Sequence, residues 1–200
     1  MTVPPAERDT YGNVVAGEER VGDETFDVEN PSTEEVVASV SVATDDDVED
    51  ALAAADEAAD EWAAYDPLER SRLLSRVARR LEEAVETLAR TETLEMGRSL
   101  GASTAQAEKT ATYFDYYAGL ADKVEGETIP IDGPSDVLDY TVREPYGVTS
   151  HVVPWNASMV LAVRSIAPAL AAGNTVVAKA DENAPLSLLT LARIAGDAGL

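Results

Sequence analysis

Asn156, Lys179 and Glu182 are three polar side chains that stand where a ligand could be bound. A strand-like run, 147–153, ends just before a Pro-Trp-Asn sequence that contains Asn156, and a second apolar run, 175–178, ends just before Lys179. An amide, an ammonium and a carboxylate together supply hydrogen-bond donors, a cation and acceptors. Such groups at the ends of two neighbouring strands are typical of half a ligand-binding site.

The residues between these two runs predict the elements that position the site. A helix-like apolar run, 159–172, closes on a Gly-Asn pair at 173–174, where glycine supplies a left-handed helix cap without any ligand. Two parallel strands joined by a helix form a right-handed βαβ unit, and ligands bind at the carboxyl ends of its strands. Asn183 and Pro185 resemble the cap of a further helix, 186–198. We therefore predict an α/β fold class with a Rossmann-like parallel sheet unit (βαβα).

The upstream chain predicts an N-terminal hairpin and three helices before this unit. Residues 1–24 are polar and glycine-containing, and we expect a loose segment there. Alternating apolar residues on either side of the turn at 30–33 predict the hairpin. Thr44 and Asp66 are predicted helix caps, each followed by an apolar stripe at helical spacing, and a third stripe covers 107–118. The second stripe continues without interruption to Leu88 and predicts one helix.

Residues 124–145 predict an extended β-arm. The prolines at 130 and 134 suit an edge strand rather than a central one. The arm could cover its own domain or add to the sheet of a neighbour, and the sequence leaves both open. The predicted division is a hairpin and helical part, 1–123, the arm, and a Rossmann-like unit, 146–200, that is incomplete at its C-terminal end.

The charge of the chain excludes several classes of partner. It has 15 basic and 38 acidic residues, for a net charge of −23, and 45% of its residues are hydrophobic. Such a surface repels nucleic acids and anionic membranes, so we predict neither as a partner. The acidic coat favours adaptation to a salty cytoplasm, where screening removes self-repulsion, over an ordinary acidic protein.

The absence of cysteine and the hydropathy of the chain limit its possible cofactors and its cellular location. The chain has no cysteine, which excludes disulfides and cysteine-ligated metals, and we predict no metal site. The N-terminus has neither a basic start nor an apolar core, so no signal peptide is expected. The most apolar segment, 157–172, is interrupted by Arg164 and Pro168 and is too short to span a bilayer. A cytoplasmic location follows as the prediction.

Several short motifs occur along the chain in one order. They are the Asn-Pro turn at 30–31, Leu-Glu-Met-Gly-Arg at 94–98, Gly-Glu-Thr-Ile-Pro at 126–130, Pro-Trp-Asn at 154–156, the Ala-Pro-Ala-Leu-Ala-Ala-Gly-Asn run at 167–174 and Val-Val-Ala-Lys at 176–179. Together they resemble the aldehyde dehydrogenase superfamily over nearly the whole chain. The resemblance implies an NAD(P)-binding domain, a catalytic domain and a β-arm used in oligomerisation. This chain matches the first part and one piece of the arm.

The resemblance implies NAD(P)-dependent oxidation of an aldehyde to a carboxylic acid. Asn156 matches the amide that stabilises the oxyanion formed when a thiolate attacks the aldehyde. Lys179 and Glu182 match the pair that binds the adenosine ribose of the cofactor. Glu182 favours NAD, although Lys179 could tolerate NADP as well.

The loop before Asn156 is also implicated by the resemblance. Val153, Pro154 and Trp155 match residues that line the cofactor pocket. Two departures concern the substrate: Ala157-Ser158 replaces the usual Phe-Pro, and Ser165 replaces a common lysine. The Arg164-Ser165 pair resembles the branch that acts on aromatic aldehydes such as benzaldehyde.

The resemblance also implies parts that these residues do not contain. The catalytic cysteine, the general-base glutamate and a second glycine-rich loop are expected beyond Leu200, so the chain is expected to be the N-terminal portion of the enzyme and inactive alone. A homo-oligomer is the expected assembly of the complete enzyme.

Without the resemblance, simpler interpretations stay open. Asn156 could be a turn residue, Trp155 a packed surface residue, and Lys179 and Glu182 solvated charges at a strand end. His151, the only histidine, is expected to be a packed strand residue without a catalytic role. The alternative function is a non-catalytic nucleotide-binding or interaction protein.

Overall fold

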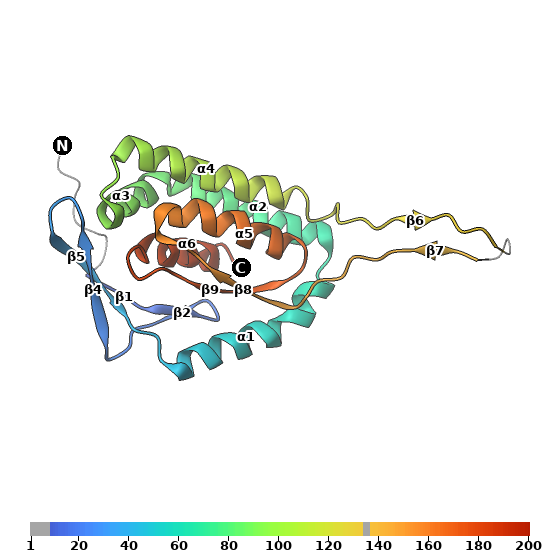
Figure 1. Ribbon diagram of the computed structural model, residues 1–200, viewed down its shortest axis with the longest axis horizontal. Coiled ribbons are helices and arrows are strands. Elements are labelled where there is room, and N and C mark those ends of the chain that lie inside the picture. Colours follow the sequence, from blue (N-terminus) through green and yellow to red (C-terminus); the bar gives the residue numbers. More distant parts are fainter. Residues whose placement is uncertain (1–8, 134–136) are drawn as a thin grey trace.

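The computed structural model describes residues 9–133 and 137–200 (Figure 1). The helices are α1 (Asp45–Ala64), α2 (Pro67–Glu83), α3 (Val85–Met96), α4 (Leu100–Ala118), the short 3-10 helix η1 (Trp155–Ala157), α5 (Ser158–Ala171) and α6 (Leu186–Asp197). The strands are β1 (Thr10–Tyr11), β2 (Asn13–Val15), β3 (Glu18–Arg20), β4 (Thr25–Asn30), β5 (Glu35–Ser41), β6 (Thr128–Ile129), β7 (Asp139–Tyr140), β8 (Val148–Val152) and β9 (Thr175–Lys179).

The predicted βαβα unit is confirmed. Strands β8 and β9 pair in parallel, from Val148 opposite Thr175 to Val152 opposite Lys179, and α5 makes the crossover between them. Helices α2, α4 and α5 form a layer on one side of these strands, and α1 lies along the other side (Figure 1). Helices therefore lie against both faces of the pair, although the strands stay partly exposed, with Val152 at 77% of its full accessibility.

One apolar core joins the helices before the arm to the unit after it. It includes Leu74 of α2, Phe114 of α4, Met159 of α5 and Leu191 of α6, all buried. Fully burying one such side chain contributes about 1.5–3 kcal/mol. The β8–β9 unit therefore depends on α2 and α4 for its stability.

The predicted helix caps at Thr44 and Asp66 are confirmed. The Thr44 hydroxyl accepts a hydrogen bond from the Asp47 amide at 3.1 Å, and the Asp47 carboxylate accepts from the Thr44 amide at 2.9 Å. At the start of α2, the Asp66 carboxylate accepts from the amide of Leu68 at 2.9 Å. These reciprocal bonds satisfy amide groups that have no partner inside the helix.

The second predicted helix is divided in two. Ala84 has φ −95° and ψ 9°, which ends α2 and starts α3, so four helices lie between residue 9 and the arm instead of three. The apolar stripe itself is correct, because Leu74, Leu81 and Leu88 are all fully buried. The change of direction at Ala84 brings α3 against α6 and the β4–β5 hairpin as well as α4.

The expectation of a loose N-terminal segment was wrong for residues 10–20. Strand β1 pairs in parallel with β5, β2 pairs with β3, and Tyr11 and Val15 are buried. Strands of two and three residues carry too little alternation to be recognised in a sequence. Residues 1–8 lie outside the described part of the chain.

The predicted hairpin of β4 and β5 is antiparallel, with a register shift between Val28 and Glu29. It packs its buried face on Leu186, the first residue of α6.

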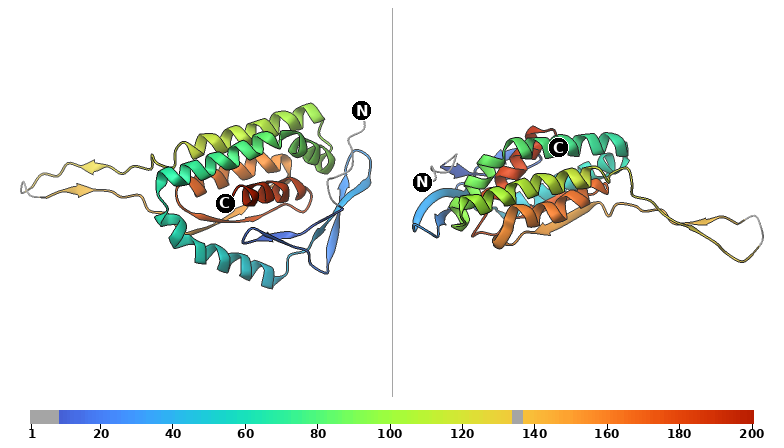
Figure 2. Two further views of the ribbon diagram at one scale, coloured as in Figure 1. Left: turned by 180° about the vertical axis from the view of Figure 1, so that it is seen from behind. Right: turned by 90° about the horizontal axis from the view of Figure 1, so that it is seen from above.

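The predicted arm is a two-stranded antiparallel ribbon of β6 and β7 that projects away from the rest of the molecule (Figure 2). It does not fold back over its own domain, which removes one of the two arrangements that the sequence left open. Its apolar side chains are exposed, with Leu138 at 73% and Tyr140 at 60% of their full accessibility. Pro134 lies outside the described residues.

Gly97 is required by the end of α3. It adopts φ +65°, and a Cβ there would lie 2.6 Å from the Ser32 hydroxyl oxygen. We expect Gly97→Ala to lower the free energy of unfolding by about 1–3 kcal/mol, since strain and a clash combine. Gly101→Ala in α4 is the matched control, because a Cβ there meets open space. That control should be neutral or stabilising by up to about 1 kcal/mol. Urea unfolding measures both, and equal effects would contradict the prediction.

Candidate functional site

The carboxyl ends of β8 and β9 bring two loops together. The Val153 amide donates a hydrogen bond to the Lys179 carbonyl at 3.0 Å, one residue beyond the paired strands. Pro154 and η1 then follow β8, and a turn containing Glu182 follows β9. The predicted residues of both loops therefore lie at one edge of the unit.

Lys179 and Glu182, which are predicted to bind the adenosine ribose, form an exposed ion pair. The Lys179 Nζ lies 3.0 Å from Glu182 Oε2, and the two side chains are 64% and 68% exposed. The main-chain amide of Glu182, together with the Lys179 ammonium, holds the pKa of the Glu182 carboxyl below its usual value. An exposed pair of this kind adds little stability, but both partners are accessible to a ligand.

Asp181 connects the two loops. Its carboxylate accepts hydrogen bonds from the main-chain and side-chain nitrogens of Asn183, at 3.0 and 2.8 Å. These bonds from Asn183, with a smaller contribution from the Trp155 amide of η1, lower the pKa of the Asp181 carboxyl. Asn183 therefore stabilises the Asp181 carboxylate. Its predicted role as a cap of α6 was wrong.

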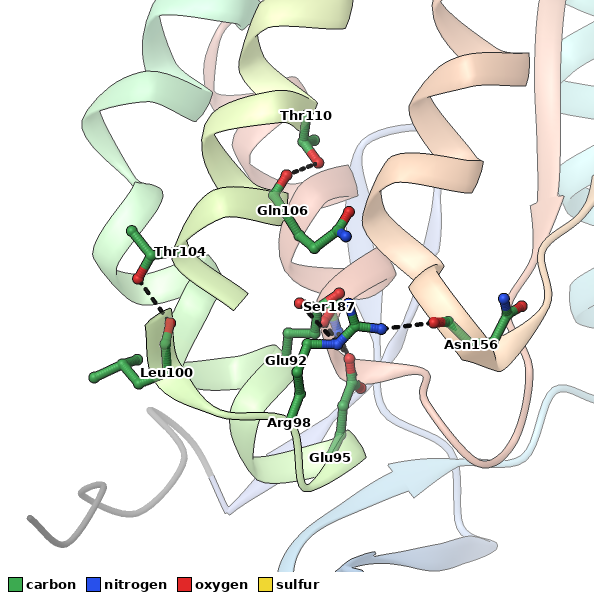
Figure 3. A network of polar contacts seen from close by, with 9 residues as sticks. All are labelled: Glu92, Glu95, Arg98, Leu100, Thr104, Gln106, Thr110, Asn156 and Ser187. Carbon is green, nitrogen blue, oxygen red and sulfur yellow. Dashed lines mark hydrogen bonds and ion pairs between the residues drawn. The ribbon is translucent and has the colours of Figure 1, made fainter. Parts of the chain in front are cut away.

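Asn156 lies in η1 and is exposed. Its main-chain carbonyl accepts a hydrogen bond from Arg98 Nη2 at 2.7 Å, and its side-chain amide projects away from Arg98 (Figure 3). Within the described residues, no side-chain contact joins Asn156 to the Lys179–Glu182 pair. The strand pairing, rather than a direct contact, brings these three residues to the same edge.

The remaining predicted site residues differ in exposure. Pro154 and Trp155 are exposed, with Trp155 at 56%, whereas Val153 is buried at 3%. Val153 can therefore offer a ligand little beyond its main-chain atoms. His151 is half-buried in β8, and its Nε2 lies 3.0 Å from the Thr149 hydroxyl oxygen, as expected of a packed strand residue.

Glu95 is a buried acid that the sequence analysis did not single out for chemistry. Its carboxylate accepts hydrogen bonds from the amide of Leu186 at 2.6 Å, the amide of Ser187 at 3.2 Å and the Ser187 hydroxyl (Figure 3). The first residues of α6 have no side-chain cap of their own. Glu95 therefore caps α6 from a distant helix.

Burial raises the pKa of Glu95 to about 7, against hydrogen bonds from Ser187 and Leu186 that lower it. The neighbouring Glu92 charge raises it further. Glu92 is fully buried, and burial also raises its pKa, although the Arg98 guanidinium opposes this. The Arg98 Nε lies 4.0 Å from Glu92 Oε2.

One signal in the sequence could have identified these acids. Glu92 and Glu95 continue the stripe that runs through Leu81, Val85 and Leu88, at the same spacing of three and four residues. A carboxylate in a position that the stripe assigns to the core must have partners, because an unpartnered buried charge is costly.

The described residues give no support to a metal site or a membrane span. They contain no group of three or more histidine, cysteine, aspartate or glutamate side chains able to hold a metal ion. In the same part of the chain, no helix has the length and hydropathy needed to cross a bilayer. One shallow hollow of about 490 Å³ lies between Arg80 and Asp197, away from the strand ends.

The parallel βαβα unit, with exposed polar groups where its strands end, defines a Rossmann-like α/β domain. The chain belongs to the aldehyde dehydrogenase family, whose model matches residues 18–200. The resemblance seen in its motifs is therefore confirmed.

Known relatives agree over most of this chain. A (Z)-2-((N-methylformamido)methylene)-5-hydroxybutyrolactone dehydrogenase of Acinetobacter baylyi is 42% identical over 176 residues, which are 87% of this chain and 36% of that protein. A solved structure from Burkholderia cenocepacia, which carries the description "Putative Aldehyde Dehydrogenase", is 42% identical with a TM-score of 0.90. The match covers 94% of this chain and 40% of the Burkholderia chain. The chain thus spans well under half the length of these relatives.

A second solved structure contains a cofactor. PnpE in complex with nicotinamide adenine dinucleotide is 36% identical, with a TM-score of 0.90, over 95% of this chain and 39% of its own.

The buried Glu95 carboxyl makes stability depend on pH. Its folded pKa of about 7 lies above the ordinary 4.5, so its contribution is complete below pH 4.5 and is lost as pH rises to 7. We expect the wild-type free energy of unfolding to fall relative to Glu95→Gln over this range, by up to about 3 kcal/mol. Glu86→Gln, an exposed acid on the same helix, controls for the loss of one carboxylate. Urea unfolding between pH 4.5 and 8 measures the difference, and a pH-independent difference would refute the buried titration.

Proposed function

We propose that this chain forms part of an enzyme that oxidises an aldehyde to a carboxylic acid with NAD or NADP. Family membership over residues 18–200 supports the reaction class. The cofactor is supported by solved relatives that contain one: PnpE with nicotinamide adenine dinucleotide, and a 3,6-anhydro-L-galactose dehydrogenase described as a complex with NAP. The observation that carries the proposal is the exposed Lys179–Glu182 pair on the strand edge that also holds Asn156.

Lys179 and Glu182 are proposed to hold the adenosine ribose of the cofactor. The Glu182 carboxylate can accept hydrogen bonds from two ribose hydroxyls, and it repels a phosphate on the 2′ oxygen. Lys179 lies 3.0 Å from it and can donate to a hydroxyl or attract a phosphate. The pair therefore favours NAD while leaving NADP possible.

The loop after β8 is proposed to line the cofactor pocket. Pro154 and Trp155 can offer ring surfaces, since both are exposed. Val153 is buried, so its part in the pocket is limited to the main chain. The cofactor, when bound there, supplies the acceptor for the hydride that leaves the substrate carbon.

Asn156 is proposed to stabilise the oxyanion of the tetrahedral intermediate. A neutral amide donates to developing negative charge and cannot protonate it. The anchored carbonyl and projecting side chain of Asn156 are suited to this role (Figure 3). The attacking thiolate is not among these residues, which include no cysteine, so the proposal assigns it to a part of the enzyme outside this sequence.

The β6–β7 ribbon is proposed to mediate self-association in the complete enzyme. Its exposed Ile131, Leu138 and Val142 would be covered by another copy, and the open strand edges can pair with a neighbouring sheet. The projection of the ribbon away from its own domain supports this arrangement.

Asn156→Ala tests the proposed oxyanion role. In the enzyme expressed from its complete coding sequence, turnover should fall about 10²–10³-fold, because one donor to the oxyanion is lost. The dissociation constant of NAD should stay nearly unchanged. Asn13→Ala, which removes an amide from strand β2, is the control and should leave both quantities unchanged. Steady-state kinetics and a cofactor titration measure both quantities, and unchanged turnover in Asn156→Ala would remove the assignment.

Glu182→Gln tests the proposed ribose contact. The neutral amide no longer repels a 2′-phosphate, so the ratio of NADP to NAD affinity should rise by about tenfold, equivalent to about 1.4 kcal/mol. Glu108→Gln, on the outer face of α4, controls for the loss of one charge from the acidic coat. Fluorescence titration with each cofactor provides the ratio. An equal change in both variants would mean that Glu182 acts only through net charge.

A further inference from the structure

Arg98 is the residue through which the helical part of the chain reaches the strand-end loop. It lies in the short link between α3 and α4, directly after Gly97, whose left-handed conformation ends α3. Its Nη2 donates to the main-chain carbonyl of Asn156 at 2.7 Å, across 58 residues of sequence. Charge-assisted bonds of this length are the stronger ones in proteins.

The Glu92 carboxylate lies near the same guanidinium. Its carboxylate is fully buried, and its Oε2 lies 4.0 Å from Arg98 Nε, whereas the Arg98 side chain is 25% exposed. Among the described residues, neither Glu92 oxygen has a hydrogen-bond partner. An isolated buried carboxylate is unfavourable, so the nearby guanidinium is its electrostatic compensation. The Glu92 carboxylate thus attracts the guanidinium, while the nearby Ser103 hydroxyl, together with Arg98, opposes the rise in the Glu92 pKa that burial causes.

The turn that carries Asn156 has little support of its own. Helix η1 has no side-chain cap, and Ala157, which follows Asn156, has φ −165° and ψ 57° between η1 and α5. The turn is therefore supported from outside, by Arg98 at the Asn156 carbonyl and by Asp181 at the Trp155 amide. Since the side chain projects on the other side of that peptide, a shift of the carbonyl also shifts the amide (Figure 3).

We propose that Arg98 is a positioning residue for Asn156: its guanidinium, oriented by buried Glu92, fixes the Asn156 peptide and so sets where the side-chain amide points. The proposal rests on the proposed oxyanion role of Asn156. Displacement of a catalytic group by about 1 Å can reduce a rate about 10²-fold, so an anchor on the main chain has a measurable effect on turnover.

The geometry also requires arginine rather than any cation. Arg98 uses Nη2 toward Asn156 and Nε toward Glu92, two nitrogens of one rigid plane. Lysine has a single nitrogen on a flexible chain and cannot reproduce this planar, two-sided contact. Arg98→Lys keeps the charge and separates a positioning role from a purely electrostatic one.

A double-mutant cycle in the enzyme expressed from its complete coding sequence tests the proposal. Arg98→Ala should lower kcat about 10–100-fold with little change in the KM for NAD, and Arg98→Lys should recover only part of it. The double variant of Arg98→Ala and Asn156→Ala should be no slower than Asn156→Ala alone, because Arg98 acts through Asn156. Arg90→Ala, an arginine of α3 paired with Glu86, is the control with unchanged kinetics.

The possible outcomes separate the two proposals. If the two single effects multiply in the double variant, Arg98 does not act through Asn156, and the positioning role is overturned. If Asn156→Ala alone leaves turnover unchanged, the proposed oxyanion role fails instead.

A second measurement does not depend on activity. In the enzyme expressed from its complete coding sequence and isotope-labelled at asparagine and alanine, the carbonyl ¹³C resonance of Asn156 and the amide resonance of Ala157 should move in Arg98→Lys, because the carbonyl loses its guanidinium donor. The Arg90→Ala control should leave both in place. Unchanged resonances at Asn156 and Ala157 in Arg98→Lys would overturn the contact on which the proposal is based.

Discussion

The register of β8 against β9 is the constraint on which the rest of the site depends. A slip of one residue would turn every side chain of β9 to the opposite face and move Lys179 away from its place beside Val152. Polar side chains fix this register where the two strands begin. The buried Asn174 donates to the Ala169 carbonyl at 3.0 Å and accepts from the Tyr146 amide at 2.6 Å, which ties the end of α5 to the start of β8.

Helix α1 fixes the start of β9 through a hydrogen bond. The Thr175 hydroxyl donates to the Ala55 carbonyl at 2.9 Å, and the Thr149 hydroxyl donates to the Thr175 carbonyl at 2.8 Å. An alternative register would leave these buried polar groups unsatisfied, which costs about 1–3 kcal/mol for each. The Gly173-Asn174 pair was predicted to have a structural role that needs no ligand. Through the hydrogen bonds of Asn174, it fixes the register of β8 against β9.

The end of α3 supports both strand-end loops. Glu95 caps α6, which begins where the turn after β9 ends, and Arg98 binds the carbonyl of Asn156 in the turn after β8. A chain with a net charge of −23 nevertheless buries Glu92 and Glu95 side by side. Three donors from α6 compensate Glu95, and the Arg98 guanidinium compensates Glu92. The two acids are tolerated because each is compensated by a group that belongs to, or contacts, a different part of the site edge.

Periodicity and local capping predicted the parts of the fold that depend on neighbouring residues. The βαβα unit, the β4–β5 hairpin and the caps at Thr44 and Asp66 all follow from residues close in sequence. The break at Ala84 could not be predicted, because neither glycine nor proline marks it and the apolar stripe continues through it.

The long-range contacts of the site were equally out of reach. Glu95 meets Leu186 across 91 residues, and Arg98 meets Asn156 across 58. The motif at 94–98 was recognised only as a mark of resemblance, since a sequence does not reveal which distant amides a buried carboxylate satisfies. The short strands β1 to β3 were missed because their pairing partners, not their own alternation, define them.

Exposed groups and buried supports are separated at this edge. Lys179 and Glu182 are more than half exposed and Asn156 is exposed, whereas Glu92, Glu95 and Asn174 are each at most 5% exposed. Changes to the exposed group affect ligand contacts and cost little stability, because few buried interactions are lost. Changes to the buried group remove hydrogen bonds or charge compensation and destabilise the fold. Arg98 combines both properties, because it lies near the buried acid Glu92 and binds the exposed turn that contains Asn156. Among these residues, Arg98 alone connects the helical core to the loop after β8.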